Sequence, residues 1–186
     1  MFHTVASNMV VLQSFAMGIP LERFTTLGNK EEELEDLKNA IKQVKDRYNL
    51  DGLVTGAIAS VYQASRIKKI ANDLSLELLN PLWHIDVENY LNSFINDGFK
   101  AIIVSVSAYG LGKDLLGKVI DNDLLSKLKS LSERYHFNLA FEGGEGETCV
   151  LDGPIFKRSI MIDEYDIIED GSKYYLDIKD AHLVGK

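Results

Sequence analysis

The alternation of helix-like and strand-like segments in the first half of the chain is the strongest constraint on its fold. Short apolar segments near residues 53–58 and 77–79 flank a segment, residues 60–74, whose apolar positions recur at helical spacing. A further helical stripe precedes them, formed by Leu34, Leu37, Ile41, Val44 and Tyr48. Parallel strands need a long crossover, which is usually a helix. The sequence therefore predicts an α/β fold with a parallel sheet covered by helices.

The pattern changes near residue 97. A helix begun by Asp86 and a strand at 101–106 continue the alternation, but one more amphipathic helix and mostly strand-like sequence follow. Asp170-Gly171 predicts a hairpin turn. The alternation after it, at Tyr174, Leu176 and Ile178, is typical of a half-buried antiparallel strand. We therefore predict an α/β domain over residues 1–96 and a smaller α+β lobe over residues 97–186.

Composition excludes several classes of protein. The chain has 186 residues, of which 46% are hydrophobic, and this is enough for one core with a small appended lobe. A net charge of -8 argues against general nucleic-acid binding. No apolar stretch approaches the roughly 20 residues of a membrane-spanning helix. The single cysteine, Cys149, excludes an intrachain disulfide and CxxC motifs, so we expect a cytoplasmic protein.

The first candidate site is the segment from Gly56 to Arg66, where a strand is followed by glycine and then a helix. In open α/β sheets such turns lie at the carboxyl edge of the strands, where ligands bind. Ser60 could simply cap the helix, with Gln63 and Arg66 at the surface. Alternatively, these three residues surround a nucleotide, and Arg66 binds phosphate through its planar guanidinium. The sequence leaves both interpretations open.

The second candidate site is acidic and rich in glycine. Glu142, Glu145 and Glu147 alternate with glycines before Thr148, and the glutamates should require a compensating cation such as Mg²⁺, ammonium, Arg or Lys. The alternative is a solvated loop in which the glycines only supply turns. We favour a shaped site, because the segment lies between residues 137–141, predicted to be a strand, and the apolar residues 149–151.

Two other features invite functional interpretation. Residues 107–114 resemble a phosphate loop, but the Walker pattern requires glycine at Ser107 and Ser or Thr at Asp114. Lys113 in this segment could instead act as a counter-charge to the glutamates. Cys149 is interpreted as a packing residue rather than a nucleophile, because no histidine lies near it in sequence.

Taken together, these segments resemble the diphthine-ammonia ligase family, a branch of the PP-loop ATP pyrophosphatases. The resemblance covers nearly the whole chain, and the acidic signature followed by Leu151-Asp152-Gly153-Pro154 is its most specific part. The other matching pieces are Met1-Phe2-His3-Thr4, Gly56-Ala57-Ile58 with Ser60, Tyr62-Gln63 and Arg66, Pro81-Leu82-Trp83, and Ser107 to Lys113.

The resemblance implies a three-layer Rossmann-like nucleotide-binding domain and a C-terminal substrate-binding lobe. It implies that ATP adenylates the carboxylate of diphthine on translation elongation factor 2, and that ammonia displaces AMP to leave an amide. Mg²⁺ would screen the departing pyrophosphate. The implied roles are catalysis by Glu142, Glu145 and Glu147, nucleotide binding by Gly56, Ser60, Gln63 and Arg66, and substrate binding by Tyr62, Gly143, Gly144, Thr148 and Lys113.

The chain departs from the family pattern in three places. Phe141 stands where relatives usually have glycine, and Gly146 stands where an aromatic residue is common, so we expect a different pocket shape. The family's N-terminal strand and Ser-Gly-Gly-Lys-Asp-Ser loop are not part of this sequence. We therefore expect a truncated gene model, in which neighbouring strand edges would be left exposed.

Three functions remain to be distinguished. The leading hypothesis is an ATP-dependent amide ligase. A non-catalytic module that binds adenine nucleotide or protein through the acidic pocket is the alternative. A PP-loop enzyme that modifies tRNA is disfavoured by the negative charge and by the lack of cysteine-based sulfur chemistry. The sequence leaves open whether the chain is a monomer or a homodimer.

Overall fold

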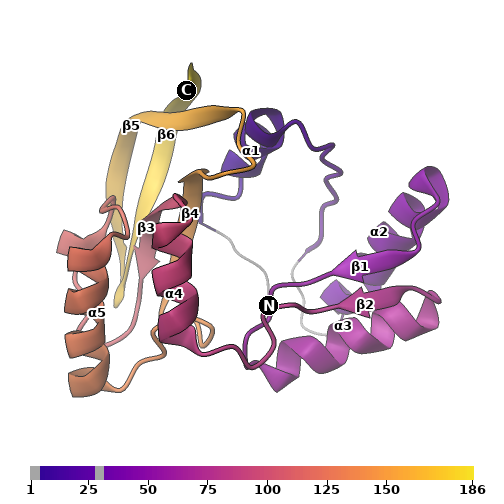
Figure 1. Ribbon diagram of the computed structural model, residues 1–186, viewed down its shortest axis with the longest axis horizontal. Helices are drawn as coiled ribbons and strands as arrows, with labels where there is room; N and C mark the ends of the chain where they lie inside the picture. Colours follow the sequence, from indigo (N-terminus) through magenta and orange to yellow (C-terminus); the bar gives the residue numbers. More distant parts are fainter. Residues whose placement is uncertain (1–4, 28–31) are drawn as a thin grey trace. The chain divides into compact units, whose positions relative to one another are not determined.

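The computed structural model describes residues 5–27 and 32–186, which form two compact units (Figure 1). The parallel unit comprises the described part of residues 22–85, and the antiparallel unit comprises the described residues up to Leu21 together with residues 86–186. The boundaries between the two units therefore lie at 21/22 and 85/86, whereas the sequence predicts one boundary at 96/97. The Met1 to Thr4 piece of the resemblance lies outside the described residues. The functional names given to the two parts stay predictions.

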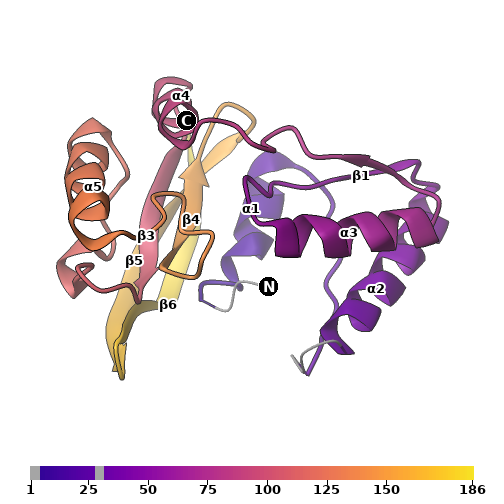
Figure 2. The same cartoon turned by 90° about the horizontal axis from the view of Figure 1, so that it is seen from below.

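The parallel unit contains α2 (Glu32–Tyr48), β1 (Gly52–Val54), α3 (Val61–Asp73) and β2 (Glu77–Leu79). The two strands pair in parallel with Gly52 opposite Glu77, and α3 forms the crossover between them. This confirms the predicted alternation and the α/β class. Figure 2 shows α2 and α3 on the same side of β1, so the three-layer arrangement is not confirmed within the described residues.

The antiparallel unit is built on a four-stranded sheet of order β4-β3-β6-β5. Its strands are β3 (Lys100–Val106), β4 (Gly146–Asp152), β5 (Arg158–Asp170) and β6 (Lys173–Gly185). Its helices are α1 (Met9–Met17), α4 (Val87–Asn96), the short η1 (Lys113–Leu115) and α5 (Asn122–Tyr135). Figure 2 shows α5 on one side of this sheet and α1 on the other. The predicted hairpin is confirmed, because β5 and β6 are joined at Gly171, whose φ is +60°.

Local signals in the sequence explain where these elements begin. Asp86 caps α4 by accepting a hydrogen bond from the Asn89 N–H at 2.8 Å, and Asp121 caps α5 in the same way through Leu124 at 2.8 Å. The apolar stripe of α5 packs inwards, with Leu124, Leu125 and Leu128 buried. The two caps and the stripe therefore fix the helices that cover β3.

The core of the antiparallel unit is centred on β3. Every residue of this strand except Lys100 is buried, because the strand lies between β4 and β6 and is covered by helices on both faces. A strand buried on both faces has a nearly continuous apolar sequence, which is why this strand could be predicted from the sequence. β3 is therefore a rigid base for the loops at its ends.

The strand predicted at residues 137–141 is wrong. The side-chain oxygen of Asn138 accepts a hydrogen bond from the Ala140 N–H at 2.8 Å, and its carbonyl accepts one from the Phe141 N–H at 2.9 Å. These bonds close a turn instead of extending the chain. Phe137 is nevertheless buried, so its apolar character reflects packing rather than a strand.

Among the residues that the structure describes, no helix is both long and apolar enough to cross a membrane.

Candidate active site

Glu145 forms the hydrogen bonds that connect the acidic loop, residues 142–147, to its neighbours. Its carboxylate accepts hydrogen bonds from the Asn138 N–H at 3.0 Å and the Gly143 N–H at 2.8 Å. Its carbonyl accepts two more, from the N–H groups of Ser107 at 2.8 Å and Ala108 at 3.2 Å. Hydrogen bonds to a charged acceptor are stronger than those between neutral groups. Glu145 therefore ties the acidic loop to the end of β3.

The glycines of the loop permit this arrangement. A Cβ atom at Gly143 would lie 2.6 Å from the Glu145 Oε1, and Gly144 has a φ of +89°, which side chains other than glycine rarely adopt. The Ser107 hydroxyl donates to the Gly144 carbonyl at 2.6 Å. The segment that resembles a phosphate loop thus supports the acidic loop through its first residue.

Glu147 has a different environment from Glu145. It lies on β4, and its side chain is only 16% exposed. One carboxylate oxygen lies 3.3 Å from the Lys173 Nζ, and the other accepts a weak hydrogen bond from the Val5 N–H at 3.4 Å. Glu147 is therefore a mostly buried carboxylate that faces a cation.

The remaining predicted residues of this region are more peripheral. Glu142 is half-buried in the loop, and Thr148 is exposed on β4 opposite Ile103. Lys113 is exposed at the start of η1 and forms no ion pair within residues 5–27 and 32–186. The cation beside Glu147 is instead Lys173, which the sequence analysis did not single out.

Two of the expected departures from the family pattern, Phe141 and Gly146, lie close together. A Cβ atom at Gly146 would be 3.0 Å from the Phe141 ring and 2.7 Å from the Ser105 carbonyl oxygen. Phe141 itself has a φ of +58°, a conformation that glycine adopts without strain. The Phe141 ring therefore occupies space that a side chain at position 146 would need.

Cys149 is part of the scaffold rather than the chemistry. It is buried on β4 opposite Ile102, and burial raises the pKa of its thiol to about 11. A thiol that stays protonated is a poor nucleophile. The geometry supports the interpretation of Cys149 as a packing residue.

Asp152, in the element that follows the acidic loop, is also held firmly. Its carboxylate lies 2.6 Å from the Lys186 Nζ and accepts hydrogen bonds from the Ser159 hydroxyl and the Gly153 N–H, both at 2.8 Å. Burial alone would raise the pKa of Asp152, but these three hydrogen bonds outweigh it and hold the pKa below its ordinary value. The charged, hydrogen-bonded Asp152 side chain therefore holds the C-terminal end of β4 in place.

The turn between β1 and α3 carries the predicted nucleotide-binding residues. Ser60 caps α3, because its hydroxyl accepts from the Gln63 N–H at 3.4 Å. The Arg66 guanidinium lies 3.5 Å from the centroid of the Tyr62 ring, one turn along the helix. Gly56 is exposed, and a Cβ atom there would meet nothing within 4 Å. The structure thus brings Ser60 beside Gln63 and Tyr62 beside Arg66.

This turn carries groups that can bind a phosphate. It offers N–H groups of the first turn of α3 and a guanidinium to a phosphate. By contrast, no group of three His, Cys, Asp or Glu side chains in residues 5–27 and 32–186 could hold a metal ion.

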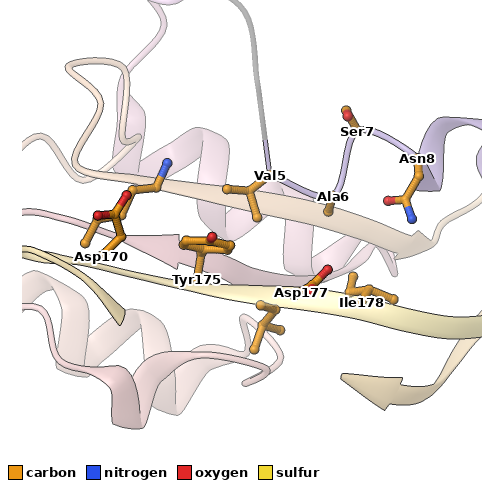
Figure 3. Close-up of a pocket in the computed structure, with 10 residues that line it drawn as sticks. Val5, Ala6, Ser7, Asn8, Asp170, Tyr175, Asp177 and Ile178 are labelled. Carbon is orange, nitrogen blue, oxygen red and sulfur yellow. The ribbon is translucent and has the colours of Figure 1, made fainter. Parts of the chain in front are cut away.

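A cavity of about 410 Å³ lies beside Glu147 and was not predicted. Figure 3 shows Val5, Ala6, Ser7 and Asn8 on one side of it and Tyr175, Asp177 and Ile178 of β6 on the other. Lys173 and Val5, which both contact Glu147, also line the cavity. The signal in the sequence was the alternation along β6, in which Lys173, Tyr175 and Asp177 are spaced two residues apart.

Two domain profiles match the chain. The diphthamide synthase N-terminal domain matches residues 1–78, and the diphthamide synthase C-terminal domain matches residues 86–184. The second match contains the acidic loop, β5 and β6.

Several vertebrate relatives are matched over about two thirds or more of their length. A protein of Danio rerio named diphthine–ammonia ligase is 37% identical over 180 residues, which cover 90% of this chain and 70% of the relative. The proteins of the same name from Homo sapiens and Bos taurus are each 34% identical; the matches cover 90% and 100% of this chain and 67% and 76% of the relatives.

Proposed function

Because the chain belongs to the diphthamide synthase family, we propose that it is a diphthine–ammonia ligase. The reaction forms a carbon–nitrogen bond between ammonia and the carboxylate of diphthine, and it is driven by ATP. The observation that carries this proposal is the match of both family domains, one of which contains the fixed acidic loop. The names of the relatives favour the ligase over a non-catalytic binding module.

We propose different roles for the three glutamates of the acidic loop. Both carboxylate oxygens of Glu145 are used by main-chain N–H groups, so we propose that Glu145 shapes the site. Glu147 faces an ammonium group, that of Lys173, in a mostly buried setting. A carboxylate so placed is suited to hold an ammonium ion and to accept a proton as nitrogen attacks the activated carbonyl carbon. Glu142 is proposed to assist Glu147.

ATP is proposed to bind at the turn between β1 and α3. The residues offered are Gly56, Ser60, Gln63 and Arg66, with Tyr62 supporting the Arg66 guanidinium. When bound, ATP supplies the activation of the diphthine carboxylate, with AMP as the leaving group. We also propose that the layers of this unit are Rossmann-like and that Mg²⁺ binds to the nucleotide phosphates. The protein is proposed to act in the cytoplasm, where Cys149 would stay reduced.

The protein substrate is proposed to be translation elongation factor 2 bearing diphthine. Gly143, Gly144, Thr148 and Lys113 are the residues proposed to contact the substrate, since they lie on or near the acidic loop, where β3 ends and β4 begins. None of these contacts requires a basic surface, which agrees with the net charge of -8.

The test is an assay of AMP release from ATP and Mg²⁺ in the presence of ammonium and the diphthine-bearing factor. We expect AMP release only when all components are present. Glu147→Gln should lower the rate by about 100-fold or more, the range of general acid–base effects. Glu133→Gln, an exposed position on α5, is the matched control and should leave the rate unchanged. ATP binding without AMP release would favour the non-catalytic module instead.

A further inference from the structure

Tyr109 lies at the tip of an ordered turn that follows β3. The Leu111 N–H donates to the Ala108 carbonyl at 3.1 Å, which closes a four-residue turn with Tyr109 and Gly110 at its centre. Gly110 has a φ of +91°, the left-handed conformation that glycine supplies at the third position of a type II turn. Tyr109 is 85% exposed, so burial of its ring contributes little to the stability of the fold.

Both ends of this turn are anchored. The Ala108 N–H donates to the Glu145 carbonyl at 3.2 Å, and Leu111 is buried in the core of the antiparallel unit. Just before the turn, Ser107 donates to the acidic loop through both its N–H and its hydroxyl. The backbone that presents Tyr109 is therefore already ordered, and binding through this side chain would require little further ordering.

The Tyr109 ring belongs to a small cluster of side chains at the surface. It packs edge-on against Tyr135, the last residue of α5, with the ring centroids 5.2 Å apart and the ring planes at 89°. A Cβ atom at Gly110 would lie 2.1 Å from the Tyr135 ring, so only glycine lets the turn come this close. The Arg134 guanidinium lies 5.1 Å from the centroid of the same ring. Tyr109, Tyr135 and Arg134 are called the tyrosine patch below.

The charges at the tyrosine patch indicate the kind of partner. Arg134 and Lys113, four positions after Tyr109, are exposed, and neither forms an ion pair with another of the described residues. Tyrosine and arginine are enriched among the residues that contribute most to protein–protein binding, whereas a nucleic acid requires neutralisation of several phosphates. The tyrosine patch therefore fits a protein surface that carries an acidic group beside an apolar one.

The tyrosine patch adjoins the acidic loop. Tyr109 directly follows Ala108, whose N–H is hydrogen-bonded to Glu145. A folded protein whose diphthine carboxylate reaches the acidic loop must therefore bring its own surface close to Tyr109. We propose that the tyrosine patch is a docking surface for the protein substrate and that Tyr109 is its main contact. This inference rests on the proposed function, which supplies the partner.

The experiment measures binding of the diphthine-bearing elongation factor to the full chain by biolayer interferometry, without ATP. Tyr109→Ala should raise the Kd about tenfold, whereas Tyr109→Phe should bind as the unmodified chain does, because the ring makes the contact. Arg134→Glu should also weaken binding, because it reverses the charge offered to the partner. Tyr165→Ala, at a 46% exposed tyrosine on β5, is the matched control and should leave the Kd unchanged. An unchanged Kd in Tyr109→Ala, or no binding by the unmodified chain, would overturn the proposal.

Kinetics separate docking from chemistry. Tyr109→Ala should raise the KM for the factor in the AMP-release assay and leave kcat unchanged, because the contact is equally strong before and during the reaction. Urea denaturation should give nearly the same midpoint for this variant as for the unmodified chain, since the ring is exposed. AMP release with an unchanged KM would overturn this inference alone. Factor binding that depends on Tyr109 without AMP release would support the docking surface and overturn the proposed function.

Two other occupants of the tyrosine patch would give different results. A second copy of the chain would produce concentration-dependent dimerisation in sedimentation equilibrium that Tyr109→Ala abolishes. A nucleic acid would produce binding of a single-stranded RNA oligonucleotide that the same variant abolishes and that weakens steeply with salt. Either result would assign the tyrosine patch to that occupant and contradict the docking of the protein substrate.

Discussion

The acidic loop and the turn between β1 and α3 both carry candidate site residues, but they are built on sheets that differ in burial. The acidic loop is tied to β3, whose residues beyond Lys100 are all buried. The turn follows β1, where Val54 is 66% exposed and pairs with Leu79, which is 52% exposed. The acidic loop therefore rests on a packed core, whereas the turn rests on a three-residue ladder and the cap of α3.

The difference in burial explains how each region positions its residues. A buried strand cannot shift without breaking many apolar contacts. A loop that is hydrogen-bonded to the end of such a strand therefore keeps a well-defined position. A short exposed ladder tolerates substitution more easily. This comparison leads to four tests, ordered from the largest expected effect to the smallest.

The first test compares the two sheets directly. Ile103→Ala should lower the free energy of unfolding by about 2–5 kcal/mol, because Ile103 is fully buried and the truncation leaves a cavity. Val54→Ala should change it by less than about 0.5 kcal/mol, since most of that side chain is exposed. Urea denaturation followed by circular dichroism measures both. Similar losses for the two variants would contradict the contrast between the sheets.

The second test uses thiol reactivity. The pKa of Cys149 is about 11 against an ordinary value of 9.0, so at pH 8 its thiolate fraction is roughly 100-fold lower than that of an exposed thiol. The native protein should therefore react with iodoacetamide at least about 100-fold more slowly than a Val54→Cys, Cys149→Ala variant. The comparison is made by mass spectrometry.

The same raised pKa sets a pH dependence of stability. The folded state keeps the proton of Cys149 while the unfolded state loses it, so stability is full below about pH 9 and declines towards pH 11. Cys149→Ala should lack this part of the decline. A native curve that matches the alanine curve would show that Cys149 is not protected from solvent.

The third test loosens the acidic loop without touching the core. Glu145→Ala removes the acceptor of the Asn138 and Gly143 N–H groups, and we expect a loss of about 0.5–1.5 kcal/mol in stability, because water can reach both exposed N–H groups. Hydrogen exchange should rise at residues 138–143 while β3 stays protected. Glu145→Gln keeps one oxygen acceptor and should recover part of the loss. Unchanged exchange in the alanine variant would mean that the loop is held by other contacts.

The fourth test addresses the turn. Ser60→Ala should cost about 0.5 kcal/mol, at the low end for helix caps, because the hydrogen bond to the Gln63 N–H is long at 3.4 Å. Asp86→Ala, which removes the 2.8 Å cap of α4, is the matched comparison and should cost about 1 kcal/mol. A larger loss for Ser60 than for Asp86 would show that the turn is more tightly held than its geometry indicates.

The sequence by itself determined the elements whose signals are local. The helical stripes, the cap at Asp86, the buried run of β3 and the β5–β6 hairpin each depend on residues within one or two turns of the chain. The cluster of glutamates and glycines likewise marked the acidic loop. The resemblance to the family suggested the reaction, because the order of the glutamates and glycines in the acidic signature, and not only their presence, is specific to that family.

Only the tertiary structure decided which residues meet across the chain. Lys173 lies beside Glu147 although 26 positions separate them, and Val5 reaches Glu147 across 142 positions. The order of the antiparallel sheet brings β3 between β4 and β6, and no local signal specifies that order. The turn at residues 137–141 was missed for the same reason, because a buried aromatic residue has the same sequence signature whether it packs from a strand or from a turn.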